Sequence, residues 1–144
     1  MPITKGYQQL VAEAMAQVKT YTVEQARARL ADPAVQMVDI RDIRELAGGT
    51  LPGAVHAPRG MLEFWVDPAS PYHKPLYADE GKAFILFCGL GWRSALAAKT
   101  LQDMGMTNVA HMEGGWDGWV KAGGPTETLE EQKARRQGKP PVGA

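Results

Sequence analysis

The sequence has 144 residues, which is enough for one domain with a full hydrophobic core and without stabilising disulfides or structural metals. Lysine plus arginine equals aspartate plus glutamate at 16 each, so overall charge recruits neither nucleic acid nor an anionic membrane. The only cysteine cannot form an internal disulfide, which suits a reducing compartment and leaves no second thiol for a dithiol redox cycle. The N-terminus shows no signal-peptide pattern and no stretch has membrane-spanning length, so we expect a cytoplasmic protein.

The predicted elements follow from apolar spacing, capping residues and turn residues. In chain order they are a helix over 6–19, a helix over 22–30, a strand over 35–40, a helical turn over 42–46, a short strand over 55–57, a short helix over 59–66, a strand over 83–87, a helix over 95–104, a strand over 108–112 and a helix over 116–122. Strands and helices alternate, which is typical of a parallel sheet with helices on both faces. The sequence therefore predicts a three-layer α/β/α fold around a central parallel sheet.

Three regions are expected along the chain. Residues 1–20 form an N-terminal helical extension that packs onto the domain, and residues 21–124 form the domain itself. Residues 125–144 are polar and charged with few apolar side chains, so we expect a polar C-terminal tail that is a frayed helix or disordered.

Cys88 lies where the apolar run 83–87 ends and a glycine-containing loop leads into the alanine-rich helix. Parallel sheets bind ligands beyond the carboxyl ends of their strands, which is where this thiol is placed. Gly89 and Gly91 allow the backbone to curl so that successive amides converge on one point, and amides at a helix start favour an anion. Such surroundings lower the pKa of a cysteine, and the thiolate is the reactive form. We therefore predict a nucleophile rather than an inert buried thiol.

Four motifs occur in the order and spacing of a known family. They are Asp39-Ile40-Arg41, Leu51-Pro52-Gly53-Ala54, Cys88-Gly89-Leu90-Gly91-Trp92-Arg93-Ser94 and Glu113-Gly114-Gly115-Trp116. Together they resemble a single-domain rhodanese, of the thiosulfate sulfurtransferase-like family, over about residues 21–124. The resemblance implies a rhodanese-like fold and a persulfide on Cys88. The thiolate would take the sulfane sulfur of a donor such as thiosulfate and pass it to cyanide or a thiol.

The residues of the loop support this chemistry on their own. The predicted persulfide-binding loop consists of Gly89, Leu90, Gly91, Trp92, Arg93 and Ser94. Its amides, if they point inward, stabilise both a thiolate and a persulfide anion, so no general base is needed. Arg93 either adds positive charge to the pocket or ties the loop to a carboxylate such as Asp39 or Glu45, and we favour the tie. Ser94 either caps the helix or donates its hydroxyl to the persulfide.

A few further side chains are candidates for a role at the pocket. Asp39 and Arg41 end a predicted strand and could reach the pocket, but a structural ion pair or loop anchor is the first choice. Arg59 could recruit an anionic donor, although an ordinary solvated surface position explains it equally well. Among the tryptophans, we expect only Trp92 to touch substrate. The three histidines have no short ligand pair with one another or with Cys88, so we expect no metal and no cofactor.

The nearest mechanistic rival is a cysteine phosphatase or an arsenate reductase. Four residues separate Cys88 from Arg93, whereas the phosphatase loop resembles C-x5-R and is one residue longer to surround a tetrahedral phosphate. The shorter loop suits a single sulfur atom. The sequence also offers no clear carboxylic acid beside the loop to protonate a leaving group.

Two other functions use the same cysteine. A sulfur carrier or docking module would hand a persulfide sulfur to one protein partner with little turnover on thiosulfate. A redox sensor would oxidise Cys88 reversibly to the sulfenic acid and would need an external thiol to reset it. The loop interior is less basic than in members that bind thiosulfate well, so a protein or low-molecular-weight persulfide is a candidate donor. We expect a small-molecule sulfur donor and a thiol or cyanide acceptor as partners, with a protein acceptor as a further candidate.

Overall fold

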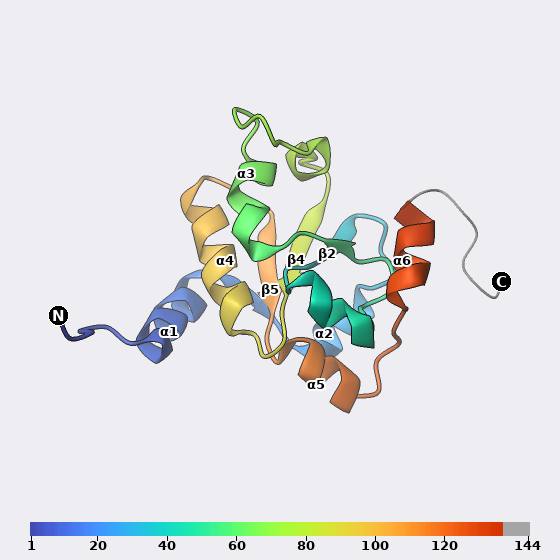
Figure 1. The fold of residues 1–144 in the computed structure, drawn as a ribbon, viewed down its shortest axis with the longest axis horizontal. Helices are drawn as coiled ribbons and strands as arrows, with labels where there is room; N and C mark the ends of the chain where they lie inside the picture. The colour runs from blue at the N-terminus through green and yellow to red at the C-terminus, as the bar shows by residue number, and fades with distance from the viewer. Residues whose placement is uncertain (137–144) are drawn as a thin grey trace.

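The protein is built on one twisted sheet of five parallel strands, seen in a computed structural model that describes residues 1–136 (Figure 1). The strands are β1 (Lys19–Tyr21), β2 (Val35–Asp39), β3 (Val55–His56), β4 (Ala83–Phe87) and β5 (Val109–Met112). Their spatial order is β1-β5-β4-β2-β3, and every neighbouring pair runs parallel. The predicted α/β fold with a central parallel sheet is confirmed.

Helices and 3₁₀ turns connect the strands. They are α1 (Tyr7–Gln17), α2 (Val23–Ala28), η1 (Ile43–Gly48), η2 (Arg59–Met61), α3 (Leu62–Val66), η3 (Pro75–Ala78), α4 (Trp92–Asp103), α5 (Gly115–Lys121) and α6 (Leu129–Arg136). The predicted capping box at the start of α2 is present. The Thr22 hydroxyl oxygen accepts from the backbone N–H of Gln25, and the side-chain oxygen of Gln25 accepts from the backbone N–H of Thr22. Helix α4 begins three residues earlier than predicted, because Gly91 adopts a left-handed conformation, with φ 97°, directly before it.

The two faces of the sheet carry separate cores, which is the expected consequence of side chains alternating along a strand. Phe84 and Leu86 of β4 point to a core shared with α3 and α4. Ile85 and Phe87 point to the opposite core, where Trp119 of α5 is fully buried beside α2. The central strand is therefore covered on both faces, as its continuous apolar sequence predicts. The three-layer arrangement follows from this.

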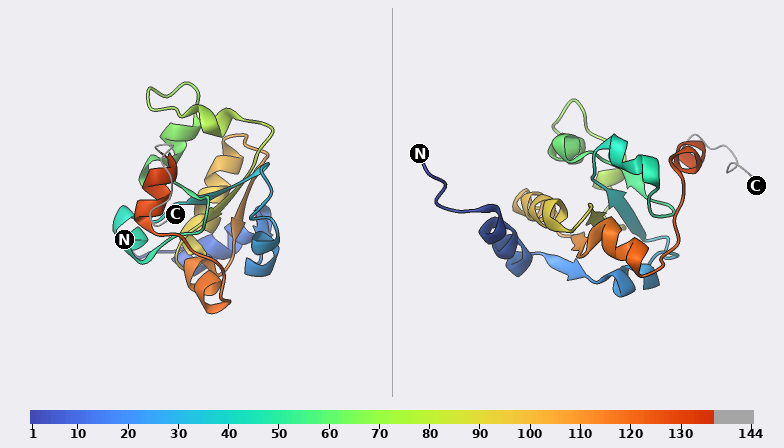
Figure 2. Two further views of the ribbon diagram at one scale, coloured as in Figure 1. Left: turned by 90° about the vertical axis from the view of Figure 1, so that its right-hand side faces the viewer. Right: turned by 60° about the horizontal axis from the view of Figure 1, so that its bottom comes forward.

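The N-terminal segment contributes both a helix and a strand to the domain. Helix α1 packs along α4, and both views in Figure 2 show the two helices side by side. The chain then enters β1, which pairs with β5 and extends the sheet by one edge strand. This strand was not predicted, because three residues are too few to show an alternating pattern.

The prediction of a frayed or disordered tail is wrong for residues 125–136. Glu127 forms an isolated bridge with Thr50, and α6 follows on the opposite side of the molecule from α1 (Figure 1). Gln132 is 3% exposed and donates from Nε2 to the carbonyl of Ala54 at 3.2 Å. Arg135 donates to the same carbonyl at 2.8 Å. Hydrogen bonds from polar side chains therefore hold α6, and the hydrophobicity of the sequence could not predict them. Residues 137–144 of the predicted tail lie outside the described residues.

No helix within residues 1–136 combines the length and apolar character needed to cross a membrane.

Candidate active site around Cys88

Cys88 follows β4 directly and is 1% exposed, at the edge of the sheet where the carboxyl ends of the strands meet. Its side chain faces the core under α4. The amide of Gly91 donates to the Cys88 Sγ at 3.2 Å. The loop therefore turns around the sulfur and aims at least one backbone N–H group at it, as the two glycines predict.

The start of α5 holds the Cys88 loop through two backbone hydrogen bonds. The amide of Trp116 donates to the Cys88 carbonyl at 2.7 Å, and the amide of Asp117 donates to the Gly89 carbonyl at 3.0 Å. Gly115 has φ 57°, and a Cβ added to it would collide with the Cys88 carbonyl oxygen. Gly114 and Gly115, at the N-cap and first position of α5, therefore let two backbones approach closely enough to hold the loop in one shape.

Arg93 pairs with a carboxylate of η1. Its Nη1 and Nη2 donate to the two oxygens of Glu45 at 2.8 and 3.0 Å, which is a bidentate pair. This hydrogen bonding is the main reason why the pKa of Glu45 is lowered and the pKa of Arg93 is raised. Of the two roles predicted for Arg93, the tie to a carboxylate is present, and Glu45 is that carboxylate. A smaller contribution to the raised pKa of Arg93 comes from Cys88, so its positive charge also reaches the pocket.

Asp39 and Arg41 form a separate buried ion pair, with side chains 0% and 3% exposed and an Nη2–Oδ2 distance of 2.8 Å. Asp39 also accepts from the Thr50 hydroxyl at 2.7 Å. Arg41 donates further to the carbonyls of Glu45 and Gly49 at 3.2 and 2.8 Å. The pair thus anchors η1 through the carbonyls of Glu45 and Gly49, which is the structural role that the sequence favours for Asp39 and Arg41.

Arg59 lies at the same edge of the sheet, because its amide donates to the Ile40 carbonyl just beyond β2 at 3.1 Å. Within residues 1–136, no hydrogen bond or ion pair engages its guanidinium. The structure places it near the carboxyl edge of the sheet but does not join it to Cys88.

Ser94 is fully buried in the first turn of α4, with its hydroxyl 3.6 Å from the Cys88 Sγ. The residue at the N-cap is Gly91, so the Ser94 side chain does not cap the helix. Of the two roles left open for this hydroxyl, the contact with the sulfur is the one that its position favours.

His111 of β5, fully buried behind Ser94, is a further polar residue at the site that the sequence did not predict there. Its Nδ1 lies 3.1 Å from the Ser94 Oγ, and its Nε2 lies 3.0 Å from the Thr20 Oγ1 of β1. Burial lowers the pKa of His111 to about 4, so the imidazole is neutral near pH 7. One feature of the sequence could have indicated this role for His111. It is a histidine inside a strand that is predicted to be buried, and a buried polar group must find polar partners.

The rim of the site is apolar and includes a residue of the N-terminal helix. Leu90 and Trp92 are 52% and 48% exposed. The ring of Tyr7, from α1, packs on Trp92 with centroids 5.2 Å apart. Trp92 is therefore exposed next to the loop, with the Tyr7 ring beside it, and its contact with substrate stays a prediction.

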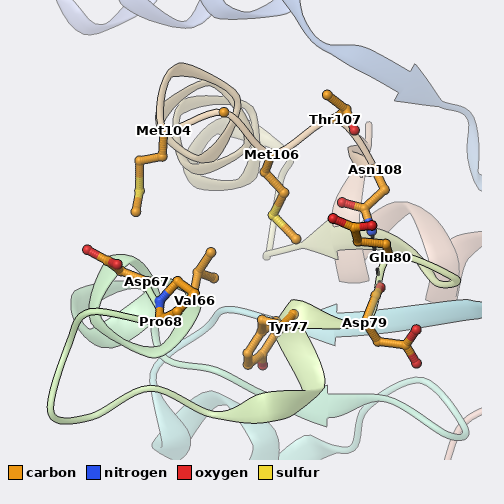
Figure 3. A pocket seen from close by; sticks show the side chains of 12 residues that line it. Val66, Asp67, Pro68, Tyr77, Asp79, Glu80, Met104, Met106, Thr107 and Asn108 are labelled. Atoms are coloured by element: carbon orange, nitrogen blue, oxygen red, sulfur yellow. Dashed lines mark hydrogen bonds between the residues drawn. The ribbon is translucent and has the colours of Figure 1, made fainter.

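A cavity of about 770 Å³ lies at the other edge of the sheet, away from Cys88 (Figure 3). Its lining comes from the end of α3, from η3 and the turn before β4, and from the connection between α4 and β5. These segments meet at the amino ends of β4 and β5, so the cavity is separate from the thiol. Within the described part of the chain, no three His, Cys, Asp or Glu side chains gather as a metal site.

Comparison with known proteins agrees with this geometry. The chain is 30% identical over 114 residues to human thiosulfate:glutathione sulfurtransferase, covering 74% of this chain and 97% of the relative. A structure from Rhodopseudomonas palustris, described as a protein of unknown function and possible tyrosine phosphatase, is 48% identical with TM-score 0.84, covering 88% and 98% of the two chains. The human single-domain sulfurtransferase has 26% identity and TM-score 0.60, covering 71% and 95%. The rhodanese-like domain family matches residues 22–122, and the chain belongs to this family.

Proposed function

We propose that this protein is a sulfurtransferase that carries sulfane sulfur as a persulfide on Cys88. The observation that supports this most is the setting of the Cys88 Sγ, with the Gly91 amide at 3.2 Å and the Ser94 hydroxyl at 3.6 Å. The Gly91 amide donates to the sulfur, and the Ser94 hydroxyl, which accepts from the thiol, can donate once the sulfur is an anion. Family membership supports the same reaction class.

The reaction consists of two displacements at sulfur. The Cys88 thiolate attacks the outer sulfur of the donor, a new S–S bond forms, and the donor's own S–S bond breaks. When thiosulfate is the donor, the leaving group is sulfite. When an organic persulfide is the donor, the leaving group is the corresponding thiolate. In the second half, cyanide or an acceptor thiolate attacks the outer sulfur of the Cys88 persulfide. Cys88 leaves as the thiolate and is ready for another turn.

An organic persulfide is the donor class that the rim favours over thiosulfate. Arg93 is already paired with Glu45, so little net positive charge remains to attract a dianion. The rim instead presents Leu90, Trp92 and Tyr7, which can cover the body of a small thiol compound. Glutathione is the thiol named for the human relative, and we propose it as an acceptor and, in its persulfide form, as a donor here.

Phosphatase chemistry is the alternative raised by the Rhodopseudomonas palustris relative. A phosphate dianion would need the guanidinium of Arg93, but both of its terminal nitrogens donate to Glu45. Glu45 has a lowered pKa and is therefore a poor general acid for a leaving group. Sulfur transfer uses neither the free guanidinium nor the acid, so the geometry favours it.

Steady-state kinetics test the proposal. We expect parallel double-reciprocal lines when donor and acceptor are varied, and kcat/KM for glutathione persulfide about tenfold or more above that for thiosulfate. The Cys88→Ser variant is the matched inactive control. Hydrolysis of p-nitrophenyl phosphate that depends on Cys88, without sulfur transfer, would replace this proposal with a phosphatase. Stoichiometric loading without turnover until a protein acceptor is added would make the protein a sulfur carrier.

A further inference from the structure

A line of buried polar side chains runs from the reactive sulfur across the interior to the N-terminal segment. Ser94 Oγ lies 3.6 Å from Cys88 Sγ, and His111 Nδ1 lies 3.1 Å from that hydroxyl. On the other side of the ring, His111 Nε2 lies 3.0 Å from Thr20 Oγ1 and 3.0 Å from Met15 Sδ. We call Cys88, Ser94, His111 and Thr20 the Cys88–Thr20 network. Ser94 and His111 are fully buried, whereas Thr20 is partly exposed.

The number of protons in this network depends on the state of the sulfur. When Cys88 is a thiolate, the Ser94 hydroxyl must donate to it, because the sulfur can then only accept. Ser94 Oγ accepts in turn from Nδ1–H of His111, and the bare Nε2 accepts from the Thr20 hydroxyl. Every hydrogen bond then points toward the sulfur.

The same network has a second arrangement when Cys88 is a thiol. The S–H group donates to Ser94, the Ser94 hydroxyl donates to the bare Nδ1, and Nε2–H donates to Thr20 Oγ1 or Met15 Sδ. The first arrangement holds one proton fewer than the second, and that proton is released to water. The imidazole stays neutral and changes tautomer. No atom of the network lacks a partner in either state.

Among the charged groups around the sulfur, Arg93 interacts with Cys88, but its raised pKa is due first to the hydrogen bond with Glu45. The ionisable side chains at the ends of the elements toward Cys88 include Arg93 of α4, Glu45 of η1, Asp39 at the end of β2, Arg41 after it, Glu113 before α5 and Asp117 in the first turn of α5. Arg93 is paired with Glu45, and Asp39 with Arg41, so both cations are matched by carboxylates. Glu113 and Asp117 would oppose an anion.

The surroundings of His111 keep it uncharged. Burial is the cause of its lowered pKa, with no charged partner involved. The ionisable groups on the flanking α1, β1 and α4 are Tyr7, Glu13, Lys19, Tyr21, Arg93, Lys99 and Asp103. Within the described residues, the hydrogen-bond partners of the ring are Ser94, Thr20 and Met15. The ring can therefore pass polarisation between Ser94 and Thr20 without itself holding a charge.

We propose that His111 is a positioning residue that stabilises the anionic sulfur of Cys88 through Ser94, by exchanging one neutral tautomer for the other when the sulfur ionises. This inference rests on the proposed function only in taking Cys88 as the nucleophile. The outer end of the network, Thr20 with Met15, belongs to the segment before the family match at 22–122. The N-terminal segment is thereby part of the active site.

The pH dependence of Cys88 alkylation by iodoacetamide tests the proposal, because only the thiolate reacts. In His111→Leu we expect the midpoint to rise by about one pH unit, so that alkylation near neutral pH slows about tenfold. His111→Asn keeps an amide N–H facing Ser94 and should recover most of the loss. Thr20→Val should shift the midpoint in the same direction by a smaller amount. His73→Leu, at a partly buried histidine away from the site, is the matched control and should leave the midpoint unchanged.

Substitution of Ser94 distinguishes an effect of His111 that acts through the Ser94 hydroxyl from an effect that comes from lost packing. If His111 acts through the Ser94 hydroxyl, Ser94→Ala should raise the midpoint as well, and adding His111→Leu to Ser94→Ala should raise it no further. Additive shifts in the double variant would overturn the proposal.

Nitrogen-15 NMR of the histidine ring gives a test that needs no variant. We expect the protonated nitrogen of His111 to change from Nε2 to Nδ1 over the pH range in which Cys88 ionises, with no imidazolium signal. One fixed tautomer throughout that range would overturn the proposal, as would an unmoved alkylation midpoint in folded His111→Leu. Both experiments omit the sulfur donor, so they can fail while sulfur transfer succeeds, or succeed while sulfur transfer fails.

Discussion

Two buried polar networks lie at or below the carboxyl edge of the sheet, and they differ in what their protons can do. The Asp39–Arg41 network, formed by these two residues and Thr50, is an ion pair with one added hydroxyl, and its donors are directed at fixed acceptors. The Cys88–Thr20 network is uncharged at its centre and can be written with its hydrogen bonds in either direction. The first has one arrangement and serves as scaffold, whereas the second can respond to a change at the sulfur. Burial is common to both, so burial alone does not identify a functional group.

Breaking the charged network should have the largest effect on stability. Asp39→Ala leaves the Arg41 guanidinium buried without its carboxylate, and we expect the free energy of unfolding to fall by roughly 3–5 kcal/mol. Urea unfolding of the purified variant measures this. The double substitution Asp39→Leu with Arg41→Met should be clearly more stable than Asp39→Ala, because no unpaired charge remains. A loss below about 1 kcal/mol in Asp39→Ala would contradict a scaffold role.

The neutral network predicts a pH dependence of stability instead. At pH values well above 6.5 the His111 ring is neutral in both the folded and the unfolded chain and contributes no slope. As the pH falls from there to about 4, the unfolded chain binds a proton that the folded chain excludes, so the free energy of unfolding drops by roughly 3 kcal/mol in total.

His111→Asn isolates this contribution from that of the carboxylates, because it removes only the titrating ring. Urea unfolding of both proteins across that pH range should show a steeper acid loss for the wild type. Equal slopes in the two proteins would show that His111 is not held neutral by burial.

The Arg93–Glu45 pair is charged like the Asp39–Arg41 pair, but solvent reaches it. The side chains of Arg93 and Glu45 are 39% and 38% exposed, so solvent screens their attraction. Glu45→Gln should therefore cost about 1 kcal/mol of stability or less. Thermal unfolding of this variant beside Asp39→Ala measures the difference. A loss as large as that of Asp39→Ala would mean that exposure does not separate the two pairs.

The smallest effect concerns the rim. Removing the ring of Tyr7 by Tyr7→Ala uncovers one face of Trp92, and we expect kcat/KM for glutathione persulfide to fall about threefold to tenfold. The value for thiosulfate should stay within about twofold, because that donor is too small to need the rim. Steady-state rates with the two donors measure both values. An equal loss for both donors would assign Tyr7 to folding of the loop rather than to donor choice.

The loop and the sheet could be predicted because their signals are local. The apolar run before Cys88, the glycines after it and the following helix are contiguous in sequence, and each has a known conformational preference. A partner for Arg93 could be narrowed to two carboxylates by the same reasoning, and the structure selects Glu45.

His111 and the two chain ends could not be predicted in the same way. The role of His111 depends on β5 lying beside β4 under α4, with β1 on its other side, and no spacing in the sequence encodes these three neighbours. Strand β1 is too short for a pattern, and α6 is held by hydrogen bonds from Gln132 and Arg135 to a single carbonyl. Composition describes α6 as solvent-exposed, although its anchor is buried.

The most direct test of a persulfide on Cys88 is the intact mass of the purified protein before and after incubation with thiosulfate or glutathione persulfide, and again after cyanide. We predict a gain of one sulfur, about 32 Da, with at least one donor, its removal by cyanide, and no gain in Cys88→Ser. A wild-type protein that gains no sulfur from either donor, or a Cys88→Ser variant that gains it equally, would contradict the account.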